Sequence, residues 1–384
     1  MKSLSLSFAS LLFLAVTILF SACDSQETVS TEYRIFVGTS TGDASVGIYS
    51  FRFDTQTGAL VEEGHTPQVF NPSYITISPD GEYLYSVNEG GRENSAVSAF
   101  RIDRATGALE RLNQQPSYGP APCYVSTDRT GRWVFSANYT GGSVALFPVE
   151  ADGRLGEAAD TVQHTGSGPN TSRQERAHAH FIRPDPQDRF VYAVDLGIDR
   201  IRIYELDRDN GELLPKGEAA VAPGAGPRHL TFHPNGRYAY VINELNGTVT
   251  AFHYNADDGS LTEFQTESTL PAGYTGDNGS ADIHVHPSGN FLYASNRGET
   301  SSIAIFTIDE STGRLTLAGH QVDLINWPRN FAIDPTGNFL LAANQRGNDI
   351  VVFRIDEQTG LLTPTGHSVA VPGPTCIQFH TVAG

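Results

Sequence analysis

One arginine and one glutamate are spaced so that their side chains could act together on a substrate. Arg228 begins an expected strand, and Glu244 follows the next strand, 16 residues later. In a hairpin these two positions lie side by side. A carboxylate can activate a water molecule, and a guanidinium can stabilise the oxyanion that forms. The alternative is a structural ion pair that holds the hairpin, since exposed Arg–Glu pairs are common and contribute little.

Histidines occur as two His-x-His pairs, His178 with His180 and His284 with His286. Side chains two residues apart in a strand point to the same face, so each pair could offer two metal ligands. A catalytic zinc needs three convergent ligands, however, and the two pairs fall in different repeat units. We therefore expect no metal. His180, His286 and His233 are expected to be neutral and hydrogen-bonded.

The segment Gly38-Thr39-Ser40-Thr41-Gly42 matches the G-x-S-x-G pattern of serine hydrolases. In those enzymes the serine lies on a sharp turn between a strand and a helix. Here it follows an expected strand, and no helix is predicted after it. Ser40 is therefore not expected to be catalytic.

The elements that must position these residues follow a repeat. Short alternating strands end in Pro-Asp-Gly-like turns, and each turn leads into an aromatic and aliphatic strand that ends in Asn or Asp. These terminal residues lie 50, 57, 48, 53 and 48 residues apart, and we expect them to cap turns. They are Asn88, Asn138, Asp195, Asn243, Asn296 and Asn344. A period near 50 with four short strands per unit predicts propeller blades.

A seventh repeat is split between the two ends of the chain. Residues 33–39 read as the strand that ends a repeat, and residues 375–380 read as the strand that should precede it. Pairing them would close the ring and leave no open sheet edge. The sequence thus predicts an all-β fold, a single seven-bladed propeller of four-stranded blades over residues 32–384.

Several motifs carry a family resemblance. His178-Ala179-His180, Gly226-Pro227-Arg228-His229, Asn243-Glu244-Leu245-Asn246, Ala281-Asp282-Ile283-His284 and Pro328-Arg329 resemble the bacterial 6-phosphogluconolactonases, a family of seven-bladed propellers. The fungal carboxymuconate cyclases share that fold and much of the site. The match runs through all blades. The resemblance implies a catalytic set of His178, Arg228, Glu244 and Arg297, a substrate-binding role for Arg329 and His284, and no cofactor.

The resemblance implies hydrolysis of a sugar lactone in carbohydrate (glucose) metabolism. Glu244 or His178 would be the base, and Arg228 and Arg297 would hold the oxyanion or an anionic group of the substrate. Two alternatives stay open: a non-enzymatic propeller that binds a carbohydrate or a protein, and a muconate-type lactonising cyclase. We expect the four catalytic candidates to converge at one mouth of the central channel, outside the core.

The first 31 residues read as a leader. Lys2 precedes an apolar stretch at 11–20, which is too short to span a membrane, and small residues precede Cys23. We interpret residues 1–23 as a signal peptide with a lipobox that ends at Cys23, and 24–31 as a polar tether; ordinary secretory cleavage is the alternative. The protein would then be an exported cell-envelope lipoprotein, which favours an unphosphorylated aldonolactone over a cytoplasmic sugar phosphate.

Composition limits the partners. The net charge of −18 lacks the basic footprint that nucleic-acid binding requires. Beyond a lipid anchor at Cys23 we expect no membrane contact, and we expect a monomer. Cys123 and Cys376 occupy equivalent positions in different repeats, so we expect them to be free buried thiols.

Overall fold

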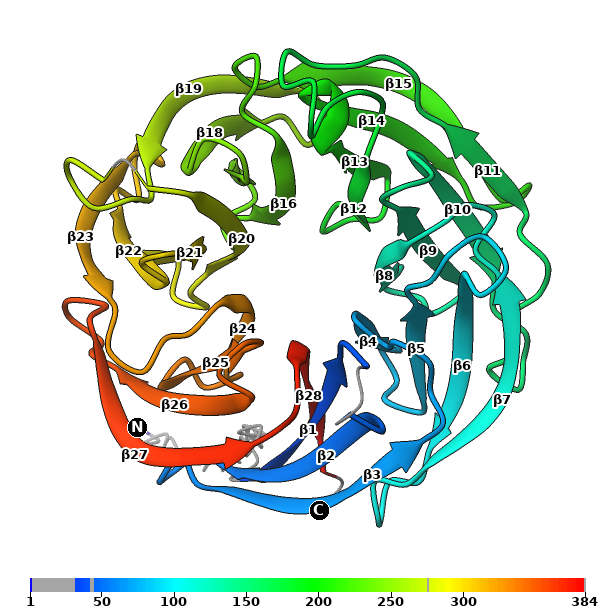
Figure 1. Cartoon of the computed structure of the whole chain (residues 1–384), viewed down its shortest axis with the longest axis horizontal. Helices are drawn as coiled ribbons and strands as arrows, with labels where there is room; N and C mark the ends of the chain where they lie inside the picture. Colours follow the sequence, from blue (N-terminus) through cyan, green and yellow to red (C-terminus); the bar gives the residue numbers. More distant parts are fainter. Residues whose placement is uncertain (2–31, 42–44, 275, 383–384) are drawn as a thin grey trace.

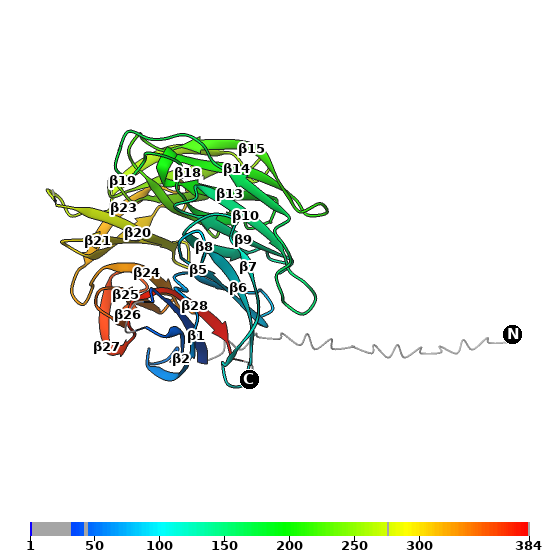
Figure 2. The same ribbon diagram turned by 45° about the vertical axis from the view of Figure 1, so that its right-hand side comes forward.

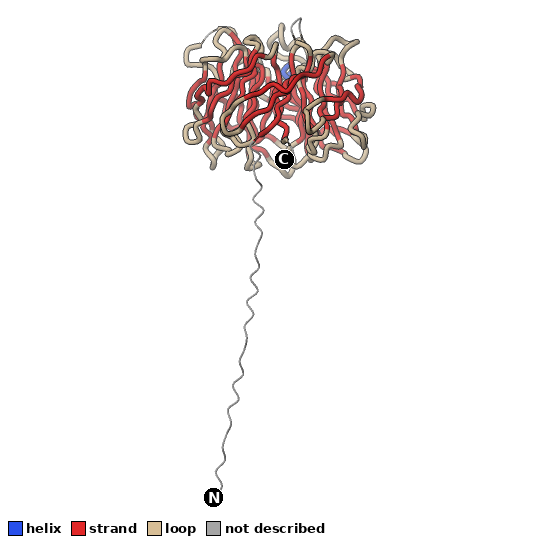
Figure 3. Tube along the Cα trace, turned by 90° about the horizontal axis from the view of Figure 1, so that it is seen from below, coloured by secondary structure: helices blue, strands red, loops and turns tan. Residues whose placement is uncertain are grey.

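The computed structural model describes Met1 and residues 32–41, 45–274 and 276–382. In this part of the chain, 28 strands form seven four-stranded sheets arranged as the blades of a ring (Figure 1). Seen edge-on, the strands run between two faces covered by loops (Figure 3). The predicted seven-bladed propeller is therefore confirmed. The predicted leader and tether, with Cys23, lie outside the described residues.

Each blade runs from an innermost strand at the channel to an outermost strand at the rim. The first contains β28 (Pro374–Thr381), β1 (Glu32–Thr39), β2 (Gly47–Asp54) and β3 (Leu60–Pro67). The second contains β4 (Ile75–Ile77), β5 (Tyr83–Asn88), β6 (Ala96–Ile102) and β7 (Leu109–Pro116). The third contains β8 (Pro122–Thr127), β9 (Trp133–Asn138), β10 (Ser143–Pro148) and β11 (Asp160–Gln163). The fourth contains β12 (Ala179–Pro184), β13 (Phe190–Asp195), β14 (Arg200–Asp207) and β15 (Glu212–Ala220), with the 3₁₀ helix η1 (Leu196–Ile198) after β13.

The remaining three blades follow the same order. The fifth contains β16 (Pro227–Phe232), β17 (Tyr238–Asn243), β18 (Thr248–Tyr254) and β19 (Leu261–Ser268). The sixth contains β20 (Asn278–Val285), β21 (Phe291–Gly298), β22 (Ser302–Ile308) and β23 (Leu315–Gln321). The seventh contains β24 (Pro328–Ile333), β25 (Phe339–Asn344), β26 (Asp349–Ile355) and β27 (Leu362–Ala370). Within the described residues, no helix has the length and apolar character needed to cross a bilayer.

The ring is closed by strands from the two ends of the chain. β1 pairs antiparallel with β28 in a register that runs from Tyr33 opposite Thr381 to Thr39 opposite Pro374. The two strands lie side by side in both Figure 1 and Figure 2. The predicted pairing is confirmed, and it removes the open edge that an unpaired β1 would present.

Tyrosines of the second strand in a blade tie neighbouring blades together. The hydroxyl of Tyr192 donates to the carbonyl of Gly259 over 2.6 Å, and Tyr293 donates in the same way to Gly360 over 2.8 Å. Both glycines have positive φ, in the tight turn between the third and fourth strands of the next blade. The aromatic strands of the repeat thus pack the blades and also bind them to each other.

A plug of side chains at or beside the innermost strands packs across the central channel. The ring of Tyr74 lies 4.1 Å from that of Tyr124 and 6.0 Å from that of His229, which belongs to the fifth blade, across the axis. His229 continues the plug through Asp282, 2.8 Å away. The plug separates two openings. We call the end where the innermost strands begin the first mouth, and the end where they finish the second mouth.

Candidate active site

A buried carboxylate at the first mouth is surrounded by three guanidinium groups. Oε1 of Glu244 accepts a hydrogen bond from Nη2 of Arg173 over 2.6 Å. Oε2 lies 3.0 Å from Nε of Arg228 and 3.0 Å from Nη2 of Arg297. The Arg228 contact is an ion pair, since Nε of Arg228 makes no hydrogen bond of good geometry. Three of the four predicted catalytic residues therefore meet around one carboxylate.

A β-bulge places Arg228 in this cluster. The β16–β17 register shifts between Pro227 and His229, so Arg228 is an extra residue in its strand. The same shift occurs in β8, β12 and β24, where the extra residues are Cys123, His180 and Arg329. Bulges redirect side chains, and here they build a layer directly above the plug.

A glycine brings the two halves of the cluster together. Gly226 has φ of 63°, and a Cβ at this position would lie 2.5 Å from Cγ of Leu245. Its carbonyl accepts the amide of Glu244 over 2.7 Å. The close approach of these backbones, which only glycine permits, sets Glu244 beside Arg228.

Burial and charge act against each other at Glu244. Only 5% of the residue is exposed, and this burial raises the pKa of its carboxyl. Arg297, Arg228 and Arg173 outweigh that effect and hold the pKa at about 2. Burial lowers the pKa of Arg228 and of Arg297, and for both residues the nearby Arg329 adds to it. Arg228 and Glu244 are thus packed as tightly as core residues, contrary to our expectation that they lie outside the core.

His178 stands beside this cluster. Its Nδ1 lies 3.0 Å from the carbonyl oxygen of Tyr139, and its Nε2 lies 3.2 Å from Oε2 of Glu175. The ring stacks on the ring of Tyr139, with centroids 4.6 Å apart. Asp195 fixes the backbone, because its Oδ1 accepts the amide of His178 over 2.7 Å. The imidazole is therefore held in one orientation by three neighbouring groups.

Tyr139 and Arg173 connect His178 with Glu244. Nη2 of Arg173 lies 3.1 Å from the hydroxyl of Tyr139 as well as 2.6 Å from Glu244. The structure thus brings all four predicted catalytic residues to one mouth, through two residues that sequence reasoning missed. Glu175 was missed as well.

Arg173 and Glu175 lie in the irregular segment between β11 and β12. Gln174 anchors this segment: it is fully buried, and its amide donates to the carbonyl of Leu196 and to Oδ1 of Asp199. A long irregular connection with charged residues just before His178 is the signal that could have found them, because such loops often carry function.

The two predicted substrate-binding residues lie at different mouths. Arg329 is part of the bulge layer, and its Nη2 lies 3.8 Å from Oε2 of Glu89. His284 is paired with Tyr293, whereas Gly279 of the same strand is paired with Arg297. This register puts His284 at the second mouth, where its Nε2 lies 3.0 Å from Oδ2 of Asp282. The structure therefore does not bring His284 to the Glu244 cluster.

The other histidines have separate surroundings. Nε2 of His286 lies 2.8 Å from the carbonyl of Gly337, and Nε2 of His233 lies 2.9 Å from that of Gly289, so both join neighbouring blades. Burial, with nearby Arg228, lowers the pKa of His180. No three His, Cys, Asp or Glu side chains of the described chain are grouped as a metal site requires. Cys123 and Cys376 are free and buried, as predicted.

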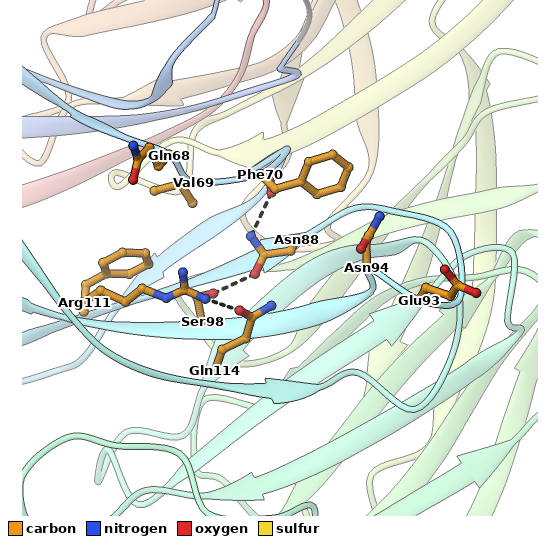
Figure 4. A pocket seen from close by; sticks show the side chains of 10 residues that line it. Gln68, Val69, Phe70, Asn88, Glu93, Asn94, Ser98, Arg111 and Gln114 are labelled. Carbon is orange, nitrogen blue, oxygen red and sulfur yellow. Dashed lines mark hydrogen bonds between the residues drawn. The ribbon is translucent and has the colours of Figure 1, made fainter.

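A side pocket of about 330 Å³ lies apart from this cluster (Figure 4). It is formed by the second blade and by the chain that leads into it, and Ser98 donates to Asn88 within it. None of the predicted site residues lines it. Ser40 follows β1, and its hydroxyl accepts from the side-chain amide of Gln345 over 3.2 Å.

Comparisons with known proteins were consistent with one another. Residues 34–379 match the family model described as "Lactonase, 7-bladed beta-propeller". The 6-phosphogluconolactonase of Bacillus subtilis is 41% identical over 91% of this chain and 99% of its own length. The 6-phosphogluconolactonase of Formosa agariphila is 38% identical over 90% and 99%. The solved periplasmic gluconolactonase of Pseudomonas aeruginosa has a TM-score of 0.86 and 33% identity, over 92% of this chain and all of that one.

Proposed function

The chain belongs to the lactonase family of seven-bladed β-propellers, and from this premise we propose that it hydrolyses a sugar lactone at the first mouth. The observation that carries the proposal is the buried Glu244 carboxylate with three guanidiniums, next to an oriented imidazole. Such a site offers both a base for water and cations for an oxyanion.

The arginines suit the charge that develops in lactone hydrolysis. One carboxylate among three guanidiniums leaves two positive charges uncompensated. When water attacks the lactone carbonyl, the carbonyl oxygen becomes an oxyanion, and preorganised cations in a buried site stabilise it strongly. Arg297 is the donor we favour, because its Nη2 lies beside Glu244 and a tenth of its side chain is exposed. Arg329 can bind another polar or anionic group of the substrate.

Between the two candidate bases, the geometry favours His178. A carboxylate with a pKa of about 2 is a weak base, and both oxygens of Glu244 already face guanidiniums. We therefore assign Glu244 a positioning role toward the arginines. Imidazole is the most common general base in proteins. With its proton on Nδ1, directed at the carbonyl of Tyr139, His178 can offer the lone pair of Nε2 to a water molecule once the half-exposed carboxylate of Glu175, now 3.2 Å from Nε2, turns aside.

The proposed reaction then proceeds in two steps. Water oxygen bonds to the lactone carbonyl carbon while its proton moves to Nε2 of His178, and the carboxylate of Glu175 stabilises the imidazolium. The tetrahedral intermediate collapses, the ring C–O bond breaks, and the leaving oxygen takes the proton back from His178. The product is an open-chain hydroxy acid, ionised at neutral pH.

The leader supports a substrate outside the cytoplasm. We propose that residues 1–23 direct export and that Cys23 carries a lipid anchor, with residues 24–31 as a tether. The similar protein of Pseudomonas aeruginosa is described as a periplasmic gluconolactonase. An unphosphorylated aldonolactone is therefore the substrate we favour.

A pH-stat assay of acid release tests the proposal. Purified protein is compared on glucono-δ-lactone and its 6-phosphate, after subtraction of spontaneous hydrolysis. We expect acceleration with the unphosphorylated lactone and a loss of about a hundredfold or more in Arg297→Gln. The matched control is Arg154→Gln, a surface arginine that pairs with Asp152. No acceleration with either lactone would favour a binding propeller instead.

A further inference from the structure

The second mouth contains a cavity of about 440 Å³ that the proposed lactonase site does not use. Tyr74 and Tyr124 of the plug form its floor. Its wall is built by residues at one level of the innermost strands, since all of them pair with the same position of the second strand in their blades. These wall residues are Thr76, Ser126, Arg183, His284 and Gln378. The cavity is therefore a product of the propeller repeat.

The cavity lining carries a positive charge, although the chain as a whole is acidic. The sequence has 43 acidic residues against 25 basic ones, yet no Asp or Glu lines the cavity, and Arg183 does. Arg183 is exposed, and in the described part of the chain its guanidinium makes no hydrogen bond or ion pair with another residue. A free guanidinium in a concave, acid-free site favours an anion, and a carboxylate matches its fork of donors.

The rest of the lining favours hydroxyl groups. Asp282 accepts from Nε2 of His284 over 3.0 Å, so in the neutral ring Nδ1 is left as an acceptor. The hydroxyl of Thr76 and the amide of Gln378 add further donors and acceptors at the same level. The tyrosine rings of the floor offer an aromatic surface. The volume lies in the range of small-ligand sites.

We propose that the second mouth is a binding site for a small polyhydroxy carboxylate, with the carboxylate on Arg183 and hydroxyls on His284, Thr76 and Gln378. This is the chemical class that lactone hydrolysis would release. The assignment comes from the lining alone, so it does not depend on the proposed activity at the first mouth. The plug of Tyr74, Tyr124 and His229 separates the two sites.

Isothermal titration calorimetry with sodium gluconate tests the site. We expect Arg183→Gln to weaken binding about tenfold or more, the effect of losing one charge-assisted hydrogen bond. Gln378→Glu, which places a carboxylate in the mouth, should weaken it similarly. Arg111→Gln is the matched control, because Arg111 lies on the outer strand β7 and contacts Gln114. Sorbitol, which has the hydroxyls without the carboxylate, should bind more weakly than gluconate.

A second comparison distinguishes gluconate binding at the second mouth from binding at the first. In Arg297→Gln, which alters only the first mouth, the component of gluconate binding that depends on Arg183 should persist unchanged. Equal gluconate affinity in wild type, Arg183→Gln and Gln378→Glu, with all three folded by circular dichroism, would overturn the proposal. So would an absence of binding in the wild type. Neither result would bear on lactone hydrolysis, which is measured separately.

Discussion

Arg173 donates from Nη2 to Oε1 of Glu244 over 2.6 Å, although 71 residues separate them in the chain. The contact joins the irregular segment before β12 to the end of β17, and so completes the cluster from a neighbouring blade. Arg173 is also partly exposed, with 42% of its side chain accessible, so a ligand can reach it.

Arg173→Gln should therefore reduce kcat/KM by about tenfold or more, since one of three cations is lost from the site. Its stability should change little, because the side chain is partly exposed. Arg154→Gln serves as the control, since Arg154 is similarly exposed and has its own carboxylate partner. Equal losses of kcat/KM in Arg173→Gln and Arg154→Gln would show that Arg173 does not belong to the active site.

Glu244→Gln should lower both the stability of the fold and the catalytic activity. Removing the carboxylate leaves Arg228 and Arg297 buried without a counter-charge, which typically costs about 3–5 kcal/mol. Urea unfolding at pH 7 measures this loss of unfolding free energy. Glu218→Gln, at an exposed pair with Arg200 and Arg202, is the control and should cost little. A loss of activity without any change in unfolding would contradict the positioning role.

The stabilisation by Glu244 should also depend on pH. Its folded pKa of about 2 lies below the ordinary value of 4.5, so its contribution is complete above about pH 4.5 and is lost as pH falls toward 2. The difference in unfolding free energy between wild type and Glu244→Gln should therefore shrink below pH 4.5. A difference that stayed constant from pH 7 to pH 3 would mean that Glu244 is not held ionised by the arginines.

His178→Gln should lower kcat by about a hundredfold or more, the usual effect of losing a general base. Glu175→Gln should have a smaller effect, because Glu175 acts on the reaction through His178. His367→Gln, at an exposed position on the outer strand β27, is the control. Full activity in His178→Gln would return Glu244 to consideration as the base.

Chelation should leave the protein unchanged. His178 and His180 lie at the first mouth and His284 at the second, so the two His-x-His pairs do not converge. After treatment with EDTA and dialysis, activity and Tm should equal those of the untreated protein. Activity that falls and is restored by zinc, manganese or calcium would show that a metal site exists.

The sequence predicted the ring because the repeat is visible residue by residue: each aromatic strand ends in Asn or Asp, and each turn has its proline or glycine. It also predicted Arg228 and Glu244, which a hairpin must bring together. It could not predict that β16 has a bulge at Arg228, because bulges depend on the register between strands. Arg173 and Glu175 escaped because the segment that holds them has no equivalent in the other blades.

His284 illustrates a different limit. The motif Ala281-Asp282-Ile283-His284 gives the residue type but not the height at which it lies along the channel. In β20 the register shifts between Ser280 and Ile283, and the strand then runs on toward the second mouth. Only the pairing with β21 reveals that His284 and Arg297 are at opposite ends of the blade.

The plug formed by Tyr74, Tyr124 and His229 lies between the first mouth and the cavity at the second mouth. If the first mouth is the lactonase site that we propose, the lactone that enters there and the hydroxy acid that leaves would share one opening. Substrate entry and product release would then take place on one face of the propeller, and the opposite face would stay free for another ligand.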